Sequence, residues 1–352
     1  MDLALYAPGL GYYVAGAHKF GRAGDFVTAP ELSPLFGACL ARQCASALNA
    51  LGGGSIVEFG GGSGALAASV LAALSAAECL PLRYAIVELS PELRVRQRAR
   101  LAAEVPHCLA RVEWWTAPPP TPMTGVVIAN EVLDALPVVR FEQQAHASFE
   151  LGVASSNASR LTLARRPATP TLVAAIALCR AASRGEWQLP YQSEINFRLE
   201  MWIAGLTEFL HAGVVILADY GYPRAEYYSA ERTQGTLQCY FRHRVHPDPL
   251  WYPGLQDITA SVDFSAVAES AHLAGFEVRG YTDQSSYLLS AGLTELLGAL
   301  PPESETYCRA AQAVKTLVLP QAMGTRAKFM VLTRGYSGPV LGFTLRDERH
   351  RL

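Results

Sequence analysis

Apolar residues follow two alternating spacings in the first part of the chain. Over residues 33–51 they recur every three to four positions, as in an amphipathic helix, and Gly52-Gly53-Gly54 ends that pattern. Short apolar runs at residues 55–59, 83–88 and 125–129 predict buried strands, and helical segments from Gly64 and over residues 91–104 separate them. Strands that alternate with helices in this way predict a doubly wound α/β fold with a mostly parallel, Rossmann-like sheet.

The pattern is less regular after Pro137. Residues 138–190 carry short alternating segments that predict a β-hairpin insertion, and residues 191–212 are expected to form one long helix before a buried strand at 213–219. Residues 222–263 lack a clear period but are rich in aromatic, histidine and proline residues, which favours a functional loop region. A helix over 264–274, a strand over 276–281 and a final strand over 327–334 would complete the sheet.

These patterns divide the chain into consecutive sections. A length of 352 residues is enough for one large core with an insertion, or for two modest domains. We expect an N-terminal cover at residues 1–32, a sheet core at 33–137 and a hairpin insertion at 138–190. A core helix and strand at 191–221 and a substrate loop region at 222–263 should follow. Residues 264–335 would complete the core with a helical insertion, and residues 336–352 would form a loosely packed extension.

Composition and charge narrow the class of protein. Half of the residues are hydrophobic, 17% are charged and the net charge is -2, which is typical of a folded cytoplasmic enzyme. Arginines 94, 96, 98 and 100 would spread around a helix, so nucleic acid is not an expected partner. The seven cysteines form no CxxC pair, which argues against disulfides and a zinc site. We read neither a signal peptide nor a membrane span.

The most specific local pattern is a strand that ends at Glu58-Phe59 and runs into Gly60-Gly61-Gly62-Ser63-Gly64 before an alanine-rich helix. Glycines, here Gly60, Gly62 and Gly64, permit a tight turn and let the backbone approach a nucleotide-like ligand. The run also fits G-x-G-x-x-A, so a nicotinamide cofactor is a real alternative. Glu58 favours S-adenosyl-L-methionine, because its carboxylate would attract a cationic amino acid and repel a pyrophosphate.

Two further acidic residues are candidates for the cofactor site. Glu88 ends the next strand, and its carboxylate could accept hydrogen bonds from both ribose hydroxyls; a solvated strand-end glutamate is the less favoured alternative. Glu113, with Trp114, follows the expected third strand and is a candidate for adenine binding.

The segment from Asn130 to Pro137 lies where α/β sheets bind ligands, at the carboxyl end of the strand at 125–129. Asn130 is a candidate for the cofactor site, and Glu131 and Asp134 could orient a cationic acceptor; helix capping is the alternative. His243 is a candidate acid–base group, as is His246, although histidines in loops are more often structural.

These motifs together resemble the MidA family of methyltransferases, also known as the complex I assembly factor 7 family. The resemblance extends over most of the chain, and several motifs occur in the same order. They are Leu5 to Tyr13, Gly24 to Ser33, the glycine turn, Asn130 to Pro137, Gly254 to Thr259 and Met323 to Phe329.

The resemblance implies a class I methyltransferase fold with an antiparallel last strand, a cofactor contact at Thr28, and methylation of arginine in a protein. In mitochondria the family's acceptor belongs to the 49-kDa subunit of respiratory complex I, which makes a respiratory complex subunit the candidate partner. A homodimer is among the states that the sequence leaves open. Relatives usually have a helix before the first motif, so we expect that Met1 is an internal start codon or that this helix has been lost. Gly61 also stands where relatives often have alanine, a small change that should still allow cofactor binding.

The expected reaction is an in-line displacement, in which the protein aligns donor and acceptor. Arginine is protonated at neutral pH, so carboxylates must hold the guanidinium and accept a proton. We assign this role to Glu131 and Asp134, with help from Glu31 of the cover. The alternatives are an NAD(P)-dependent oxidoreductase and a non-catalytic assembly factor that retains the fold.

Overall fold

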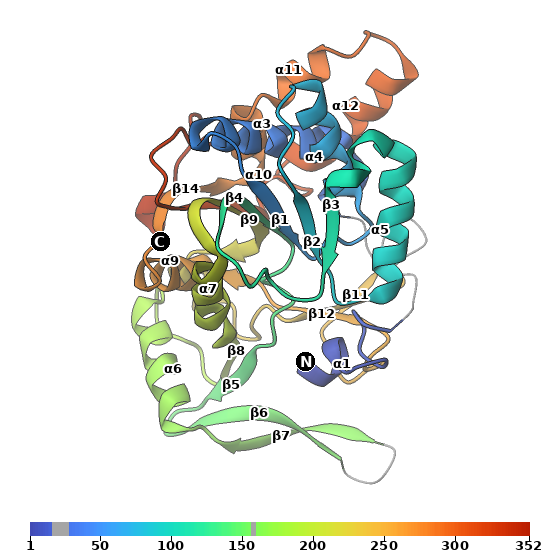
Figure 1. Ribbon diagram of the computed structural model, residues 1–352. Helices are drawn as coiled ribbons and strands as arrows, with labels where there is room; N and C mark the ends of the chain where they lie inside the picture. The colour runs from blue at the N-terminus through green and yellow to red at the C-terminus, as the bar shows by residue number, and fades with distance from the viewer. Residues whose placement is uncertain (16–27, 156–159) are drawn as a thin grey trace.

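The structure is a computed structural model that describes residues 1–15, 28–155 and 160–352. Its central sheet has the strand order β14-β15-β9-β4-β1-β2-β3 (Figure 1). Adjacent strands from β9 to β3 are parallel, whereas β15 is antiparallel to both β9 and β14. The predicted fold class is therefore confirmed. The strands are β1 (Ser55–Phe59), β2 (Tyr84–Val87), β3 (Val112–Trp115), β4 (Met123–Asn130), β9 (Leu210–Tyr222), β14 (Glu277–Asp283) and β15 (Ala327–Arg334).

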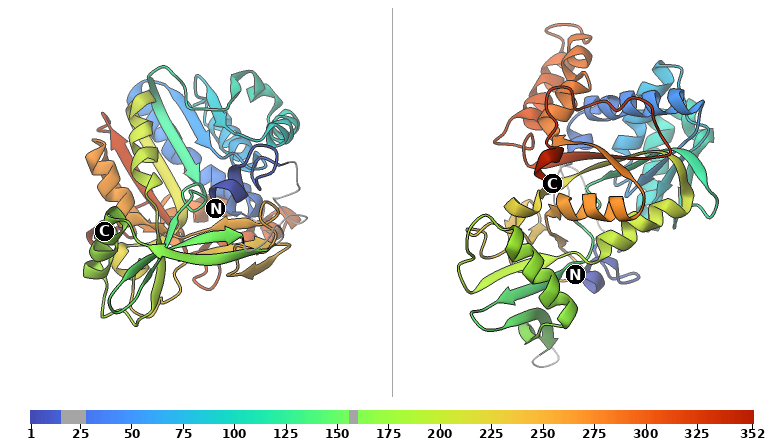
Figure 2. Two further views of the ribbon diagram at one scale, coloured as in Figure 1. Left: turned by 90° about the horizontal axis from the view of Figure 1, so that it is seen from below. Right: turned by 90° about the vertical axis from the view of Figure 1, so that its left-hand side faces the viewer.

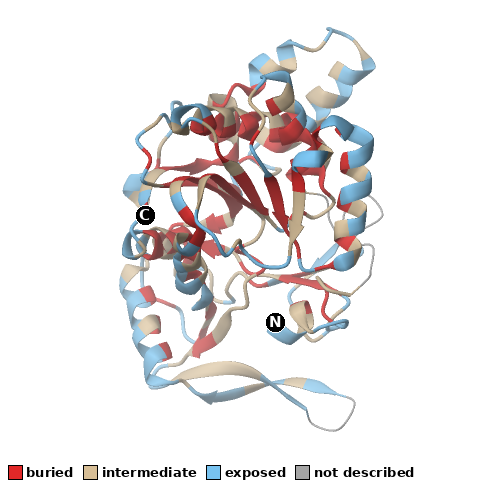
Figure 3. Cartoon of the chain, in the orientation of Figure 1, coloured by how far each residue is buried: buried red, intermediate tan, exposed pale blue. Residues whose placement is uncertain are grey.

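Both faces of this sheet are buried (Figure 3). Because successive side chains on a strand point to opposite faces, Ile56 belongs to one hydrophobic cluster and Val57 to the other. Helices α7 (Arg198–Phe209) and α9 (Phe264–Leu273) cover the Val57 side. The Ile56 side is covered by α3 (Pro34–Leu51), α4 (Ala65–Ala76), α5 (Pro91–Glu104), α10 (Gln284–Ser290), α11 (Leu293–Gly298) and α12 (Glu305–Val318), and the 3-10 helix η1 (Pro106–Arg111) precedes β3.

Two smaller sheets flank the core. The hairpin insertion forms a four-stranded antiparallel sheet, which lies away from α3 and α4 and packs against α6 (Pro170–Ala182) (Figure 2). Its strands are β5 (Val139–Gln143), β6 (Ser148–Ser155), β7 (Leu161–Pro167) and β8 (Tyr191–Ile195). A three-stranded sheet, in the order β11-β10-β12, packs against α1 (Asp2–Tyr6). It comprises β10 (Gln238–Phe241), β11 (Arg244–His246) and β12 (Asp257–Thr259).

Short elements complete the description. They are α2 (Ala29–Leu32), α8 (Arg224–Tyr227), β13 (Val262–Asp263), which pairs with β9, and the C-terminal 3-10 helix η2 (Arg349–Arg351). Among the described ranges, no helix has the length and hydropathy that a membrane span requires.

Two sequence expectations are wrong. The single helix expected over residues 191–212 is a strand followed by a helix and a second strand. The strand Tyr191–Ile195 pairs with β5, and the ring of Tyr191 stacks on Trp187 with centroids 4.0 Å apart. The tail after Gly335 is also not loosely packed. The Glu348 amide donates to the carbonyl of Tyr281 at 2.6 Å, and Arg351 pairs with Glu226 and Glu348.

Candidate functional site

A cavity of about 1010 Å³ lies at the carboxyl ends of β1, β2, β4 and β9. The glycine turn forms part of its wall, and three of its glycines have left-handed backbone angles, with φ of 65° at Gly60, 52° at Gly62 and 84° at Gly64. Side chains with a Cβ disfavour this conformation. Gly60 and Gly62 line the cavity, whereas Gly64 shapes the turn into α4 from outside the lining. The prediction of a turn that only glycine readily forms is therefore confirmed.

Glu58 and Glu88 both line this half of the cavity, as expected for cofactor residues. Glu58 is 2% exposed and accepts a hydrogen bond from the Tyr84 hydroxyl at 2.6 Å. Burial raises the pKa of Glu58 to about 7, against the opposing effect of the Tyr84 bond. Glu88 accepts from the amide of Ser90 at 2.9 Å and from Gln97 Nε2 at 3.1 Å. Their contacts to a cofactor remain predictions.

Gln97 on α5 is a residue that the sequence reasoning missed. It is fully buried, and Nε2 also donates to the carbonyl of Gly62 at 2.9 Å, while Oε1 accepts from Trp114 Nε1 at 3.0 Å. One side chain thus fixes the glycine turn relative to Glu88. The available signal was a polar residue between Leu93 and Leu101 on the apolar face of a helix.

Besides Gly64, several predicted residues lie away from the cavity lining, among them Trp114 and His246. Glu113 is within β3, where it pairs with Arg83 at 2.7 Å, because the strand continues to Trp115 and the lining begins at Thr116. His243 is exposed in the turn between β10 and β11. Glu31 bonds to Arg100 and Ser63 instead of facing the acceptor.

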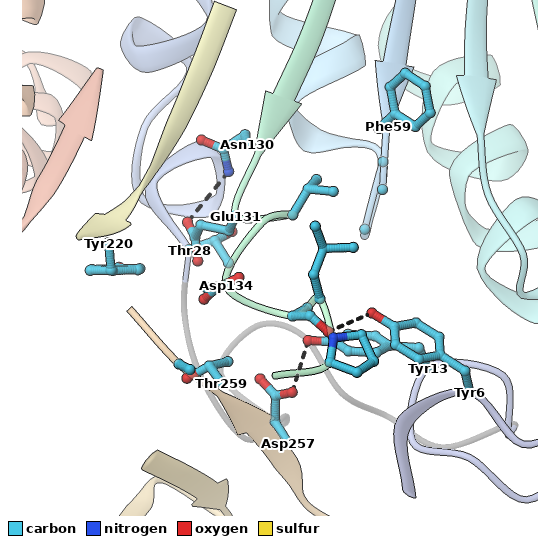
Figure 4. A pocket seen from close by; sticks show the side chains of 18 of the residues that line it. Tyr6, Tyr13, Thr28, Phe59, Asn130, Glu131, Asp134, Tyr220, Asp257 and Thr259 are labelled. Atoms are coloured by element: carbon cyan, nitrogen blue, oxygen red, sulfur yellow. Dashed lines mark hydrogen bonds between the residues drawn. The ribbon is translucent and has the colours of Figure 1, made fainter. Parts of the chain in front are cut away.

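The N-terminal cover reaches the cavity through Tyr6, Tyr13, Thr28 and Pro30. Thr28 lies next to Asn130 and Glu131 in Figure 4, where the resemblance had placed a cofactor contact. The stretch from Gly24 to Val27 in the same motif is outside the described residues.

The acidic part of the cavity begins where β4 ends. Asn130, Glu131 and Asp134 all line it, and Asn130 Nδ2 donates to Glu131 Oε1 at 3.4 Å (Figure 4). Glu131 has a φ of 54°, an unfavourable value for a residue with a side chain, while its amide donates to the carbonyl of Ala218 at 2.8 Å. A strained residue at a strand end is typical of a functional site.

Asp219, which the sequence reasoning did not single out, holds this segment in place. Its Oδ2 accepts from the backbone amides of Val132, Leu133 and Asp134 at 3.1, 2.8 and 3.2 Å, and its Oδ1 accepts from the Tyr220 amide at 2.8 Å. Asp219 is the last residue of the strand predicted over 213–219 and follows Ala218, the residue that pairs with Asn130, and that position was the available signal. Asp219 therefore positions Glu131 and Asp134.

Burial and mutual repulsion make this cluster a strong proton acceptor. Burial raises the pKa of Glu131 to about 8, with a further increase from the charge of Asp219. The pKa of Asp134 is well above its usual range for the same reasons, and that of Asp219 is about 7 mainly because of burial. Among residues 1–15, 28–155 and 160–352, no ion pair engages these three carboxylates. The arrangement is suited to a cationic ligand.

Comparison with known proteins identifies the family. The family model described as "Putative S-adenosyl-L-methionine-dependent methyltransferase" matches residues 39–282. The chain belongs to this family. It is similar to a Burkholderia thailandensis protein crystallised with S-adenosyl-homocysteine, with 44% identity, a TM-score of 0.93 and coverage of 100% of this chain and 90% of that chain. A second structure from the same organism is 42% identical, with a TM-score of 0.90 and the same coverage.

Curated relatives agree with the resemblance seen in the sequence. The Drosophila melanogaster "Protein arginine methyltransferase NDUFAF7 homolog, mitochondrial" is 28% identical over 98% of this chain and 84% of its own length. The Danio rerio "Protein arginine methyltransferase NDUFAF7, mitochondrial" is 27% identical over 94% and 81%. The predicted membership is confirmed.

S-adenosyl-L-methionine is accordingly the cofactor, and the protein is a methyltransferase. The site fits it: Gly60, Gly61 and Gly62 present backbone without side chains to the cavity, and Glu58 and Glu88 supply carboxylates beside the turn. A volume of about 1010 Å³ also leaves room for an acceptor side chain. The nicotinamide alternative is not favoured.

Proposed function

We propose that this methyltransferase acts on an arginine side chain of a protein substrate. The proposal rests on one observation: Glu131 and Asp134 line one wall of the cavity, with Asp219 bonded to the backbone behind them, and none of the three forms an ion pair in the described part of the chain. A guanidinium, which carries a permanent positive charge and only hydrogen-bond donors, complements such a wall. The names of the curated relatives, protein arginine methyltransferases, support the same acceptor.

The chain's own groups would perform two tasks. When bound, the cofactor supplies the electrophilic methyl group on its sulfonium. Glu131 and Asp134 hold the guanidinium so that one nitrogen faces that methyl group, and the new N–C bond forms as the S–C bond breaks. The same nitrogen gives up a proton to one of the two carboxylates, which leaves a methylguanidinium and an uncharged thioether. Asp219 keeps both residues in position through the backbone.

The electrostatics of the cluster support this division of roles. Its raised pKa values mean that the empty site retains protons near neutral pH, and an arriving guanidinium favours the charged carboxylates. Acceptor binding is therefore linked to proton release. A carboxylate whose pKa lies near the working pH is also an effective base.

A subunit of a respiratory complex, reached in the cytoplasm, is the first protein substrate to test. Labelled S-adenosyl-L-methionine is incubated with the protein and with membrane extract from a strain that lacks it, and the labelled band is analysed by mass spectrometry. We expect methylarginine in one protein. Label on another residue type or on a small molecule would overturn the proposal.

Three variants make this experiment specific. Glu131→Gln and Asp134→Asn should lose at least about 100-fold in methyl transfer while calorimetry still detects S-adenosylhomocysteine. Glu305→Gln is the matched control, since that glutamate is exposed on α12 and outside the cavity lining. Cofactor binding by the unaltered protein with no labelled product would instead favour a non-catalytic assembly factor.

A further inference from the structure

A second wall of the cavity, next to the acidic cluster, also carries a carboxylate. Asp257 lies on β12, is 2% exposed and lines the cavity, as does Tyr240, its partner on β10. The Tyr13 hydroxyl donates to Asp257 Oδ1 at 2.8 Å. In Figure 4, Asp134 and Asp257 both lie in the part of the cavity that Tyr6 and Tyr13 border.

Tyr6 and Tyr13 connect the two walls. Their rings stack with centroids 5.7 Å apart, and the Tyr6 hydroxyl donates to the carbonyl of Ala135 at 2.9 Å. One tyrosine is thus bonded to the segment of Asp134, and the other is bonded to Asp257. The pair forms a fixed aromatic surface between two carboxylate groups.

The two walls border one space, since Asp134, Tyr240 and Asp257 all line the same cavity and the Ala260 amide donates to the carbonyl of Asp134 at 3.0 Å. Burial is the largest cause of the raised pKa values of Glu131 and Asp134, but the charge of Asp257 contributes to both. Burial is also the main cause of the raised pKa of Tyr240, to which the charges of Asp134, Asp257 and Glu131 add. A cation between the walls would therefore interact with all of these carboxylates.

We propose that Asp257 is a second guanidinium-binding carboxylate and that, with the stacked pair of Tyr6 and Tyr13, it selects arginine over lysine. This inference rests on the proposed function. A guanidinium is a planar fork with five N–H groups and can bond to two carboxylates at once while its face lies against an aromatic ring. A lysine ammonium is a compact point charge, which one wall can satisfy.

The test compares Asp257→Asn with the unaltered protein on the same membrane extract, at two dilutions. Acid hydrolysis releases the labelled amino acids, and chromatography then separates methylarginines from methyllysine. We expect at least a tenfold loss of arginine label in the dilute extract, a partial recovery in the concentrated extract, and a larger share of lysine label. Such a split indicates a higher KM more than a lower kcat.

Controls separate this role from a merely structural one. Tyr13→Phe removes only the hydroxyl donor, so it should cause a smaller loss in the same direction and still report on Asp257 if Asp257→Asn does not fold. Asp248→Asn, in the same region but outside the cavity lining, should retain full activity. Calorimetry with S-adenosylhomocysteine should give the same affinity for all variants.

Two negative outcomes are distinguishable. If the unaltered protein labels arginine and Asp257→Asn does so with the same KM and the same arginine share, only this inference is wrong. If the unaltered protein labels no arginine, the proposed function fails and this inference fails with it.

Discussion

Replacement of Asp219 by asparagine tests whether one buried carboxylate organises the acceptor side of the site. Asp219 accepts hydrogen bonds from four backbone amides, three of them through the same oxygen. Hydrogen bonds to a charged acceptor stabilise by about 1.5–3 kcal/mol and those to a neutral one by about 0.5–1.5 kcal/mol. Three weakened bonds therefore cost about 3 kcal/mol in total.

Two further effects of Asp219→Asn act in opposite directions. The new amide group would face the Tyr220 amide, which leaves a buried donor unsatisfied at a cost of about 1–3 kcal/mol. The loss of a buried negative charge offsets part of this cost, because burial disfavours the ionised form. We expect a net decrease of about 2–4 kcal/mol in the free energy of unfolding.

Urea denaturation at pH 8.5, above the pKa of about 7, measures this decrease while Asp219 is charged. Methyl transfer should decrease at least about tenfold in kcat/KM, whereas the affinity for S-adenosylhomocysteine should change less than twofold. Asp219 also raises the pKa values of Glu131 and Asp134, so its removal should move the acid limb of the pH–rate profile to lower pH. Unaltered stability, or an acid limb that stays in place, would refute the reasoning.

Three other changes probe the rest of the site. The pKa of Glu131 is raised from 4.5 to about 8, so between these pH values the folded chain binds more protons than the unfolded chain and its stability falls as pH rises. Glu131→Gln should therefore raise the Tm at pH 8 more than at pH 5. Equal increases in Tm at the two pH values would contradict this. Gly61→Ala would place a Cβ 2.6 Å from Ile86 Cγ2 and should lower the affinity for S-adenosylhomocysteine, measured by calorimetry, roughly fivefold. Gly205→Ala is the control, because its Cβ would have no neighbour within 4 Å and the affinity should not change. Glu88→Gln should raise the Kd for the same ligand roughly tenfold if Glu88 binds the ribose, and an unchanged Kd would exclude that contact.

The sequence alone was sufficient for the fold class and for the glycine turn that lines the cavity. Helical and strand periodicities are local, and the helix over Pro91–Glu104 and the strand over Ala327–Arg334 have the predicted limits. The glycine turn was also predictable, because glycine adopts left-handed backbone angles without a steric penalty, as Gly60, Gly62 and Gly64 do. Glu131 and Asp134 were found because they follow a strand at the ligand-binding edge of the sheet.

Only the tertiary structure decided which side chains meet across the cavity. Tyr13 and Asp257 are 244 positions apart, and Asp219 bonds to amides more than 80 positions before it, so no local pattern relates them. Residues 191–195 form a strand rather than a helix because β5 offers a pairing edge, which overrides local preference. Local spacing therefore determines elements, whereas burial and long-range pairing determine which charges share one space and what they can bind.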